Sequence, residues 1–372
     1  MKIGILTTPL HNNYGGLLQA YALQSQLKRM RHDVWILQRE QKGALLKLMR
    51  FCRRLLYLLK GKYCVTEKDR KMLSVNMNYF RDKYICPKSP YLFSTQQMSN
   101  YIDAQHFNAV IVGSDQVWRP TYTPFITNYF LDFVRQEDVK RISYAASFGV
   151  DTWEFSAEDT ERCKSLIKRF KTVSVREESA IMLCRDQFQL EACQVLDPTF
   201  FFEKEFYEEL ITQENEKGVE GDMFFYILDK TEEKQRVIDL IADLLDYKTY
   251  DCMPAYMNYA DMTKENREEF KYPPVTQWLR SIRDAKMVLT DSFHGCVFSI
   301  IFNKPFWVIP NASRGTARFV SLLKIFGLGS RILDAGNISH IDWLCPIDWK
   351  KVNEIKETWK VKSLQFLQDS LS

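Results

Sequence analysis

Short apolar runs alternate along the chain with longer segments whose apolar residues recur at helical spacing. Helical patterns in the first half include residues 16–30 and 157–170. An alternation of this kind predicts βαβ units and therefore parallel sheets. The strands predicted in the first half are residues 2–7, 33–37, 109–113, 141–146, 172–176 and 194–197.

A second alternating series follows a polar segment. Residues 212–221, TQENEKGVEG, carry no apolar period and predict an interdomain linker. Residues 351–371 predict a charged amphipathic helix that packs back across either domain. The strands predicted after the linker are residues 223–228, 248–252, 286–290 and 305–309, and the helices are residues 232–245, 276–284, 294–302 and 317–326.

The pattern as a whole predicts an α/β fold with two Rossmann-like domains, an interdomain cleft and a C-terminal helix. We expect an N-terminal domain over 1–212, on the acceptor side, and a C-terminal domain over 222–345, on the donor side. Residues 346–372 would form the helix that packs back on the domains. Ligands of such sheets bind beyond the carboxyl ends of the strands, so the residues there are the candidates for chemistry.

Composition narrows the class of protein. The formal net charge of +4 is mild, which argues against a nucleic-acid binder. The chain opens MKIGILTTPL, a buried strand rather than a signal peptide, and no apolar stretch reaches the length of about 18 residues that spans a membrane. We therefore expect a cytoplasmic location. The nine cysteines are scattered without a C-x-x-C pair, which favours small buried side chains over a metal site or disulfides.

The loop after the first strand ends in Asn13, Tyr14, Gly15 and Gly16 before a helical pattern. Paired glycines at a helix start allow close backbone approach, and free N–H groups there favour anions or hydroxyls. A plain tight turn is the alternative. The chain contains neither G-x-G-x-x-G nor the P-loop pattern, so dinucleotide and P-loop sites lose support.

The run AVIVG leads into Ser114, Asp115 and Trp118. A carboxylate beside a large aromatic ring suits a sugar, which presents hydroxyls and an apolar face. The alternative is a helix cap by Ser114 or Asp115, with Trp118 in the core.

Basic residues follow strands in both halves. Arg176 follows a buried run, and its planar fork matches a carboxylate or phosphate; an ion pair with Glu177 or Glu178 is the alternative. His294 lies at a helix start that favours anions, unless it only holds the turn. Two further arginines lie in the loop after the last strand, and together the four would form an anion-binding cleft from both domains: Arg176, His294, Arg314 and Arg318.

These motifs resemble the polysaccharide pyruvyl transferase family. The resemblance runs through IGILTTPLHNNYGGLLQAYAL, VIVGSDQVW, ISYAASFG, SVREESA, VLDPTF, TDSFHGCVFSIIFNKPF and ARFVSLLKIFGL, in that order. It implies a fold similar to the GT-B type of glycosyltransferase and phosphoenolpyruvate as the donor. It also implies a ketal-linked pyruvate on a capsule or exopolysaccharide sugar as the product, with no cofactor and no metal.

The resemblance assigns roles to the candidate residues. Arg176 and His294 map onto the basic donor-site positions, and Arg318 fits the third position better than Arg314. The donor set is completed by Ser292 and Gly295. Catalysis would fall to His294 as a general acid and to Asp115, which would deprotonate or orient the acceptor. The residues expected to bind the acceptor glycan are Asn13, Gly15, Gly16, Ser114, Trp118 and Tyr144.

Two other functions stay open: a GT-B glycosyltransferase that uses a nucleotide sugar, and a non-catalytic relative that binds a sugar or an anion.

Residues 43–63, GALLKLMRFCRRLLYLLKGKY, combine leucines at near-helical spacing with six basic and no acidic residues. This pattern predicts a helix that lies on the inner face of the cell membrane, near a lipid-linked acceptor. An ordinary surface helix is the alternative.

Overall fold

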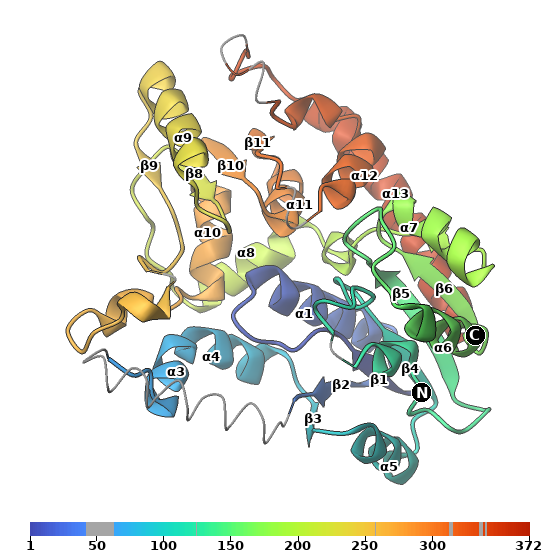
Figure 1. Ribbon diagram of the computed structural model, residues 1–372. Coiled ribbons are helices and arrows are strands. Elements are labelled where there is room, and N and C mark those ends of the chain that lie inside the picture. The colour runs from blue at the N-terminus through green and yellow to red at the C-terminus, as the bar shows by residue number, and fades with distance from the viewer. Residues whose placement is uncertain (42–62, 124, 257, 312–314, 335–337, 339–340) are drawn as a thin grey trace.

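The computed structural model describes residues 1–41, 63–123, 125–256, 258–311, 315–334, 338 and 341–372. In this part of the chain, strands form two parallel sheets, one of seven strands in the order β3-β2-β1-β4-β5-β6-β7 and one of four in the order β11-β10-β8-β9. Figure 1 shows the larger sheet in the lower half of the molecule and the smaller one in the upper half.

The first sheet contains β1 (Lys2–Leu6), β2 (Asp33–Arg39), β3 (Lys88–Leu92), β4 (Ala109–Val112), β5 (Lys140–Ala146), β6 (Thr172–Val175) and β7 (Cys193–Gln194). The helices that accompany it are α1 (Tyr14–Arg29), α3 (Glu67–Leu73), α4 (Val75–Tyr84), α5 (Thr95–Gln105), α6 (Ala157–Ile167), α7 (Glu178–Leu183) and α8 (Lys204–Gln213). The second half contains β8 (Met223–Tyr226), β9 (Thr249–Tyr250), β10 (Met287–Thr290) and β11 (Phe306–Val308), with α9 (Glu232–Leu245), α10 (Val275–Asp284), α11 (Phe293–Ile301) and α12 (Ala317–Phe326).

Both faces of the first sheet are buried at its centre, which explains why β1 and β4 are nearly continuous apolar runs. Ile3 and Ile5 of β1 face the core that contains α1, whereas Leu6 faces a second core with Val110 and Val112 of β4. The core around α1 continues into the second half through Phe224 and other side chains of β8, β10 and α11. The two halves therefore share this apolar core.

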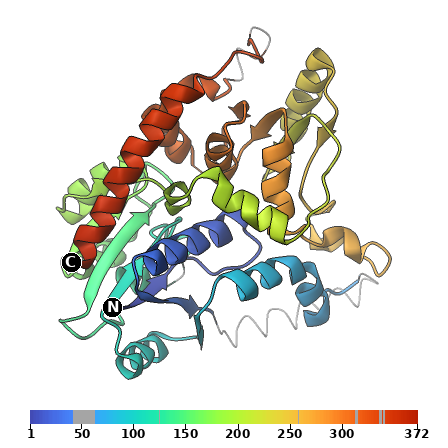
Figure 2. The same cartoon turned by 180° about the vertical axis from the view of Figure 1, so that it is seen from behind.

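The C-terminal helix α13 (Trp349–Leu371) runs behind the molecule and crosses the first sheet beside β5 (Figure 2). Its Lys356 and Lys360 form ion pairs with Glu203, at 2.6 and 2.7 Å. The helix predicted at residues 351–371 thus packs back on the N-terminal half. Helix α8 precedes the predicted linker in sequence but contacts α10 of the second half.

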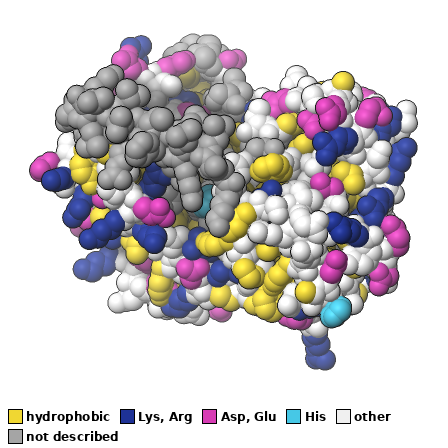
Figure 3. Space-filling view, turned by 60° about the horizontal axis from the view of Figure 1, so that its bottom comes forward, with side chains coloured by type: hydrophobic (Ala, Val, Ile, Leu, Met, Phe, Trp, Pro, Cys, Tyr) yellow, Lys and Arg dark blue, Asp and Glu magenta, His cyan; other side chains and the backbone are white. Residues whose placement is uncertain are grey.

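The sequence pattern did not predict β3, α3, α4, α5, α7 or α8, and the predicted linker at residues 212–221 begins inside α8. Strand β3 contains Pro90 at the edge of the sheet, and its burial alternates weakly, so it carries little periodic signal. The basic segment at residues 43–63 lies, apart from Tyr63, outside the described residues. Among the helices that the structure does describe, none combines the length and apolarity needed to cross a bilayer. On the face in Figure 3, basic and acidic side chains are interspersed rather than gathered by sign.

Candidate functional site

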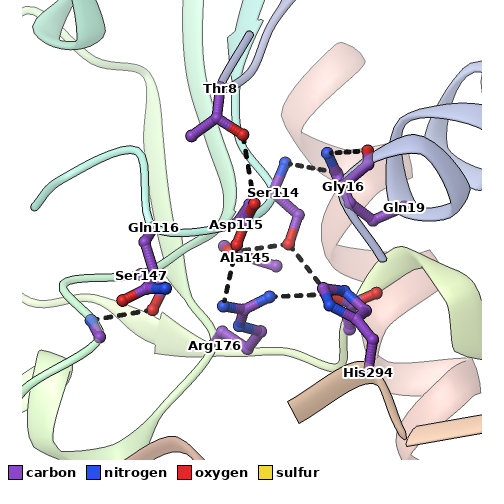
Figure 4. Close-up of polar contacts among 12 residues, drawn as sticks. Thr8, Gly16, Gln19, Ser114, Asp115, Gln116, Ala145, Ser147, Arg176 and His294 are labelled. Atoms are coloured by element: carbon purple, nitrogen blue, oxygen red, sulfur yellow. Dashed lines mark hydrogen bonds and ion pairs between the residues drawn. The ribbon is translucent and has the colours of Figure 1, made fainter. Parts of the chain in front are cut away.

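The candidate site lies where the carboxyl ends of strands from both sheets meet. Strands β4, β6 and β7 are followed by Asp115, Arg176 and Asp197, and β10 is followed by the first turn of α11, which carries His294. Figure 4 shows Arg176 and His294 next to each other, with Ser114 and Asp115 above them. The topology of the parallel sheets thus brings together residues that are far apart in sequence.

Asp197 joins the two basic residues. Its Oδ2 atom lies 2.9 Å from Arg176 Nη1 and 3.5 Å from His294 Nε2, the second distance being that of an ion pair with poor hydrogen-bond geometry. Burial alone would raise the pKa of Asp197, but the adjacent His294 and Arg176 more than offset this and hold the pKa well below its ordinary value. Asp197 is therefore ionised at neutral pH.

Arg176 keeps one edge of its guanidinium without a partner. Nη1 donates to Asp197, whereas Nε and Nη2 are buried and have no hydrogen-bond partner among the described residues. Asp115 Oδ1 lies 3.6 Å from Nη2, which is an ion-pair distance but beyond a hydrogen bond. Nε and Nη2 together form one of the edges with which arginine binds a carboxylate or phosphate.

A second arginine approaches the same place from the other half. The guanidinium carbons of Arg176 and Arg318 lie 4.2 and 5.7 Å from the centre of the Phe293 ring. Burial, reinforced by the charge of Arg176, lowers the pKa of Arg318 to about 10, so the side chain is still a cation at neutral pH. The cluster thus contains two guanidinium groups beside the carboxylates of Asp115 and Asp197.

His294 packs directly on the first turn of α1. A Cβ atom at Gly15 would lie 2.0 Å from His294 Nδ1 and 2.2 Å from its Cγ, so only glycine allows this approach. Asn13 caps the same helix by accepting a hydrogen bond from Gly16 N at 3.0 Å. The glycine pair thus brings the start of α1 against the imidazole.

The loop after β4 is held by several polar contacts. Ser114 Oγ lies 3.1 Å from Ala145 O and 3.2 Å from Asp197 Oδ2, either of which can accept its single proton, and the backbone N of Ser114 donates to Gln19 Oε1. Thr8 Oγ1 donates to Asp115 Oδ2 at 3.2 Å. Asp115 itself adopts a left-handed φ of 76°, an uncommon conformation for a residue with a side chain. These contacts place the Asp115 carboxylate beside Arg176.

Glu177 fixes the neighbouring loop after β5. Its fully buried Oε1 accepts hydrogen bonds from Ser147 Oγ, Phe148 N and Gly149 N, at 2.9, 2.8 and 3.1 Å. Glu178 pairs instead with Lys324. The alternative in which Arg176 pairs with Glu177 or Glu178 is therefore wrong, because both carboxylates have other partners and Arg176 pairs with Asp197.

Two of the predicted acceptor residues are placed where they cannot contact a sugar. Trp118 is fully buried, stacks on Phe130 and donates to Tyr129 O, so the alternative of a core tryptophan is correct. Tyr144 is also fully buried and donates to Leu196 O. An aromatic residue after an apolar run does not reveal which face of the sheet its ring covers, and here both rings fill the core.

The remaining predicted residues divide between the site and its supports. Ser292 caps α11, with its Oγ 3.5 Å from Gly295 N, and Gly295 packs against Thr290. Arg314 lies outside the described residues. The structure brings the following predicted residues together in one cluster: Gly15, Ser114, Asp115, Arg176, His294 and Arg318.

The sequence reasoning did not single out Asp197 or Asp291. Asp197 stands in VLDPTF, where an aspartate before proline is typical of a turn, so nothing local signals its two basic partners. Asp291 accepts hydrogen bonds from Leu228 N and Lys234 Nζ, both at 2.6 Å, and so ties the loop before α11 to the end of β8. Within the described part of the chain, no three His, Cys, Asp or Glu side chains form a group that could hold a metal.

The fold is shared with solved structures of low sequence identity. UDP-N-acetylglucosamine 2-epimerase from Rickettsia bellii superposes with a TM-score of 0.54 at 10% identity, over 100% of this chain and 97% of that one. The UDP-GlcNAc 2-epimerase from Methanocaldococcus jannaschii gives 0.51 at 14% identity, over 96% and 92%. Arabidopsis thaliana UGT89C1, complexed with UDP-L-rhamnose, gives 0.51 at 10% identity, over 99% and 98%.

These likenesses identify the fold as GT-B and carry no further conclusion, since the identities are low. None of the curated proteins matches the chain significantly. The model of one family, polysaccharide pyruvyl transferase, matches residues 13–313. This range includes Arg176 and His294 but not Arg318. That match covers most of the chain, and the protein therefore belongs to the polysaccharide pyruvyl transferase family.

Proposed function

We propose that this protein transfers a pyruvyl group from phosphoenolpyruvate to a sugar of a bacterial surface polysaccharide, with formation of a ketal. Its family makes it a transferase of polysaccharide biosynthesis, with a donor and a glycan acceptor. The observation that carries the finer proposal is the buried Nε and Nη2 edge of Arg176, which has no hydrogen-bond partner among the described residues and lies in a cluster with His294 and Arg318.

A buried donor without a hydrogen-bond partner costs about 1–3 kcal/mol, more where the donor is charged. Such groups are rare in folded proteins and call for an explanation. A carboxylate or phosphate on the Arg176 edge would satisfy both nitrogens at once, and phosphoenolpyruvate carries one of each. The nearby Arg318 cation would help to balance up to three negative charges on the donor.

The reaction needs a proton on the methylene carbon of phosphoenolpyruvate. Protonation makes the central carbon electrophilic, one sugar hydroxyl adds there, phosphate leaves, and a second hydroxyl closes the ketal. At the central carbon, two C–O bonds to the sugar replace the C=C π bond and the C–O bond to phosphate. In the overall balance, one proton equivalent from the two hydroxyls ends on the new methyl group and the other on the released phosphate. No oxidant or reductant is required.

We assign protonation of the donor to His294, and orientation or deprotonation of the acceptor hydroxyl to Asp115. His294 lies at the start of α11 with a ring nitrogen facing the cluster, which suits a general acid that contributes about 10²–10⁴ in rate. Asp115 lies beside Arg176 and accepts a hydrogen bond from Thr8, and its carboxylate would orient or deprotonate a sugar hydroxyl. No metal ion or cofactor takes part in this scheme.

The test is phosphate release from phosphoenolpyruvate in the presence of a panel of lipid-linked and synthetic glycosides. We expect release with the native protein and none above background with Arg176→Ala or His294→Ala. Arg141→Ala is the matched control, because Arg141 is also buried but donates to backbone carbonyls at the other end of β5. A parallel series with nucleotide sugars tests the glycosyltransferase alternative, and transfer from those donors alone would overturn the proposal.

A further inference from the structure

We infer that Asp197 is a positioning residue that holds Arg176 of one half and His294 of the other in the arrangement that binds the anionic donor. The inference extends the proposed function to a residue that never meets the substrate, and its substrate part rests on that proposed function. It comes from the contacts of Asp197 with elements that are distant in sequence.

Five groups surround the carboxylate of Asp197. Oδ2 lies 2.9 Å from Arg176 Nη1, 3.2 Å from Ser114 Oγ and 3.5 Å from His294 Nε2. Oδ1 accepts from Thr199 N at 3.1 Å and from Thr199 Oγ1 at 2.8 Å. One oxygen is thus fixed by its own loop, and the other is directed at the site.

The backbone around Asp197 is itself anchored, so the carboxylate cannot follow its partners. Leu196 N donates to Ser363 Oγ of α13 at 3.0 Å, and Tyr207 OH of α8 donates to Thr199 O at 2.7 Å. Asp197 also caps the short 3₁₀ helix η3 (Pro198–Phe201), which packs against α1, α11 and α13. The Asp197 carboxylate is therefore held in a fixed position next to Arg176 and His294.

The side chain of Asp197 has no exposed area, and both of its oxygens already face protein groups, so it offers no free atom to a substrate. Its effect must pass through Arg176 and His294. By taking Nη1, it fixes the plane of the Arg176 guanidinium and leaves the Nε and Nη2 edge for the donor. By facing Nε2 at 3.5 Å, it limits rotation of the His294 ring. In the proposed scheme the acceptor sugar meets Asp115 rather than these groups, so the effect should be selective for the donor.

The test compares Asp197→Asn, which keeps the shape but loses the charge, with the native protein. We expect the KM for phosphoenolpyruvate to rise about 10- to 100-fold, as for loss of a charge-assisted contact, and the KM for the glycan acceptor to stay unchanged. Asp69→Asn is the matched control. Asp69 is also a buried carboxylate, but it belongs to the capping box of α3, away from the site. It should lower thermal stability without changing either KM.

A second measurement does not depend on turnover. Ring ¹⁵N–¹H spectra of the five histidines, with His294 assigned from His294→Gln, should show His294 shifted in Asp197→Asn and unchanged in Asp69→Asn. If the native protein does not turn over phosphoenolpyruvate, the proposed function fails, and the ring spectra alone decide the role of Asp197. An unchanged His294 signal together with an unchanged KM for the donor would overturn the inference.

Thr199→Val provides a milder variant in case Asp197→Asn does not fold. It removes the 2.8 Å hydroxyl contact to Oδ1 and keeps the Asp197 charge. We expect a smaller rise in the KM for phosphoenolpyruvate, again without a change for the acceptor, and a smaller shift of the His294 signal. A rise in both KM values by the same factor would indicate a general structural role and contradict the inference.

Discussion

Replacement of Gly15 by alanine tests whether the close approach of α1 to His294 matters for activity. The new Cβ would lie 2.0 Å from His294 Nδ1, 2.2 Å from Cγ and 2.6 Å from Cβ, whereas ordinary contacts begin near 3.4 Å. The ring would have to retreat by about 1.4 Å, away from the start of α1. It cannot do so without changing its 3.5 Å contact with Asp197.

The expected effects on stability and on activity differ in size. Alanine is favoured over glycine inside a helix by about 1 kcal/mol, while overpacking costs about 1–3 kcal/mol, so the free energy of unfolding should fall by about 2 kcal/mol at most. A misplacement of about 1 Å at a reacting group can cost about 100-fold in rate. We therefore expect kcat/KM for phosphoenolpyruvate to fall about 100-fold in a protein that remains folded.

The assay is phosphate release with phosphoenolpyruvate and an accepted glycoside, together with a thermal melt. Gly329→Ala is the matched control, because a Cβ at Gly329 meets no atom within 4 Å. It should keep the native kcat/KM. A Gly15→Ala protein with kcat/KM within about twofold of native would refute the placement of His294 in the reaction.

Four further expectations follow from the site. Arg176→Lys keeps the charge but loses the planar fork, so the KM for phosphoenolpyruvate should rise about tenfold; an unchanged KM in steady-state kinetics would argue against bidentate binding. Trp118→Phe removes the 2.9 Å hydrogen bond to Tyr129 O, so the unfolding free energy measured with urea should fall by about 1 kcal/mol. The KM for the acceptor should stay unchanged, and a raised value would indicate that Trp118 contacts the glycan. Activity should survive EDTA, and a loss that only added Mg²⁺ or Mn²⁺ restores would contradict the metal-free scheme. The folded-state pKa of Asp197 is held below the unfolded value of about 3.9, so its ionisation stabilises the fold above that pH and stabilises it less as the pH falls. The difference in unfolding free energy between the native protein and Asp197→Asn should therefore be larger at pH 7 than at pH 3. Equal differences at the two pH values would contradict the ion pairs of Asp197.

Periodicity predicted the elements that pack on a regular face. The ends of β2, β5, α9 and α12 fall within two residues of the prediction, because their apolar spacing is unbroken. Strand β7 is only Cys193–Gln194, although the apolar run continues, because Leu196 N bonds to Ser363 of α13 instead of extending the ladder. A contact with a distant helix leaves no mark on the local pattern.

The site could be predicted as a set of strand-end residues but not as a network. The sequence singles out Arg176 because a basic side chain after a buried run is unusual, and His294 because it lies at a helix start. Asp197 was missed because its partners belong to three other elements, and the pairing exists only once both sheets are assembled. The prediction for Trp118 is wrong for a similar reason. The aromatic pocket that buries its ring is formed by residues that are distant in sequence, such as Phe130 and Phe148.

The central claim is that the carbon skeleton of phosphoenolpyruvate reaches the glycan. Carbon-13 NMR of a reaction with phosphoenolpyruvate labelled at its central carbon follows that carbon directly. With the native protein and an accepted glycoside, we predict that the enol signal is replaced by that of a ketal carbon bonded to two sugar oxygens, in step with phosphate release, and that Arg176→Ala leaves the enol signal unchanged. An enol signal that persists with the native protein, while the same glycoside is modified from a nucleotide sugar, would contradict the account.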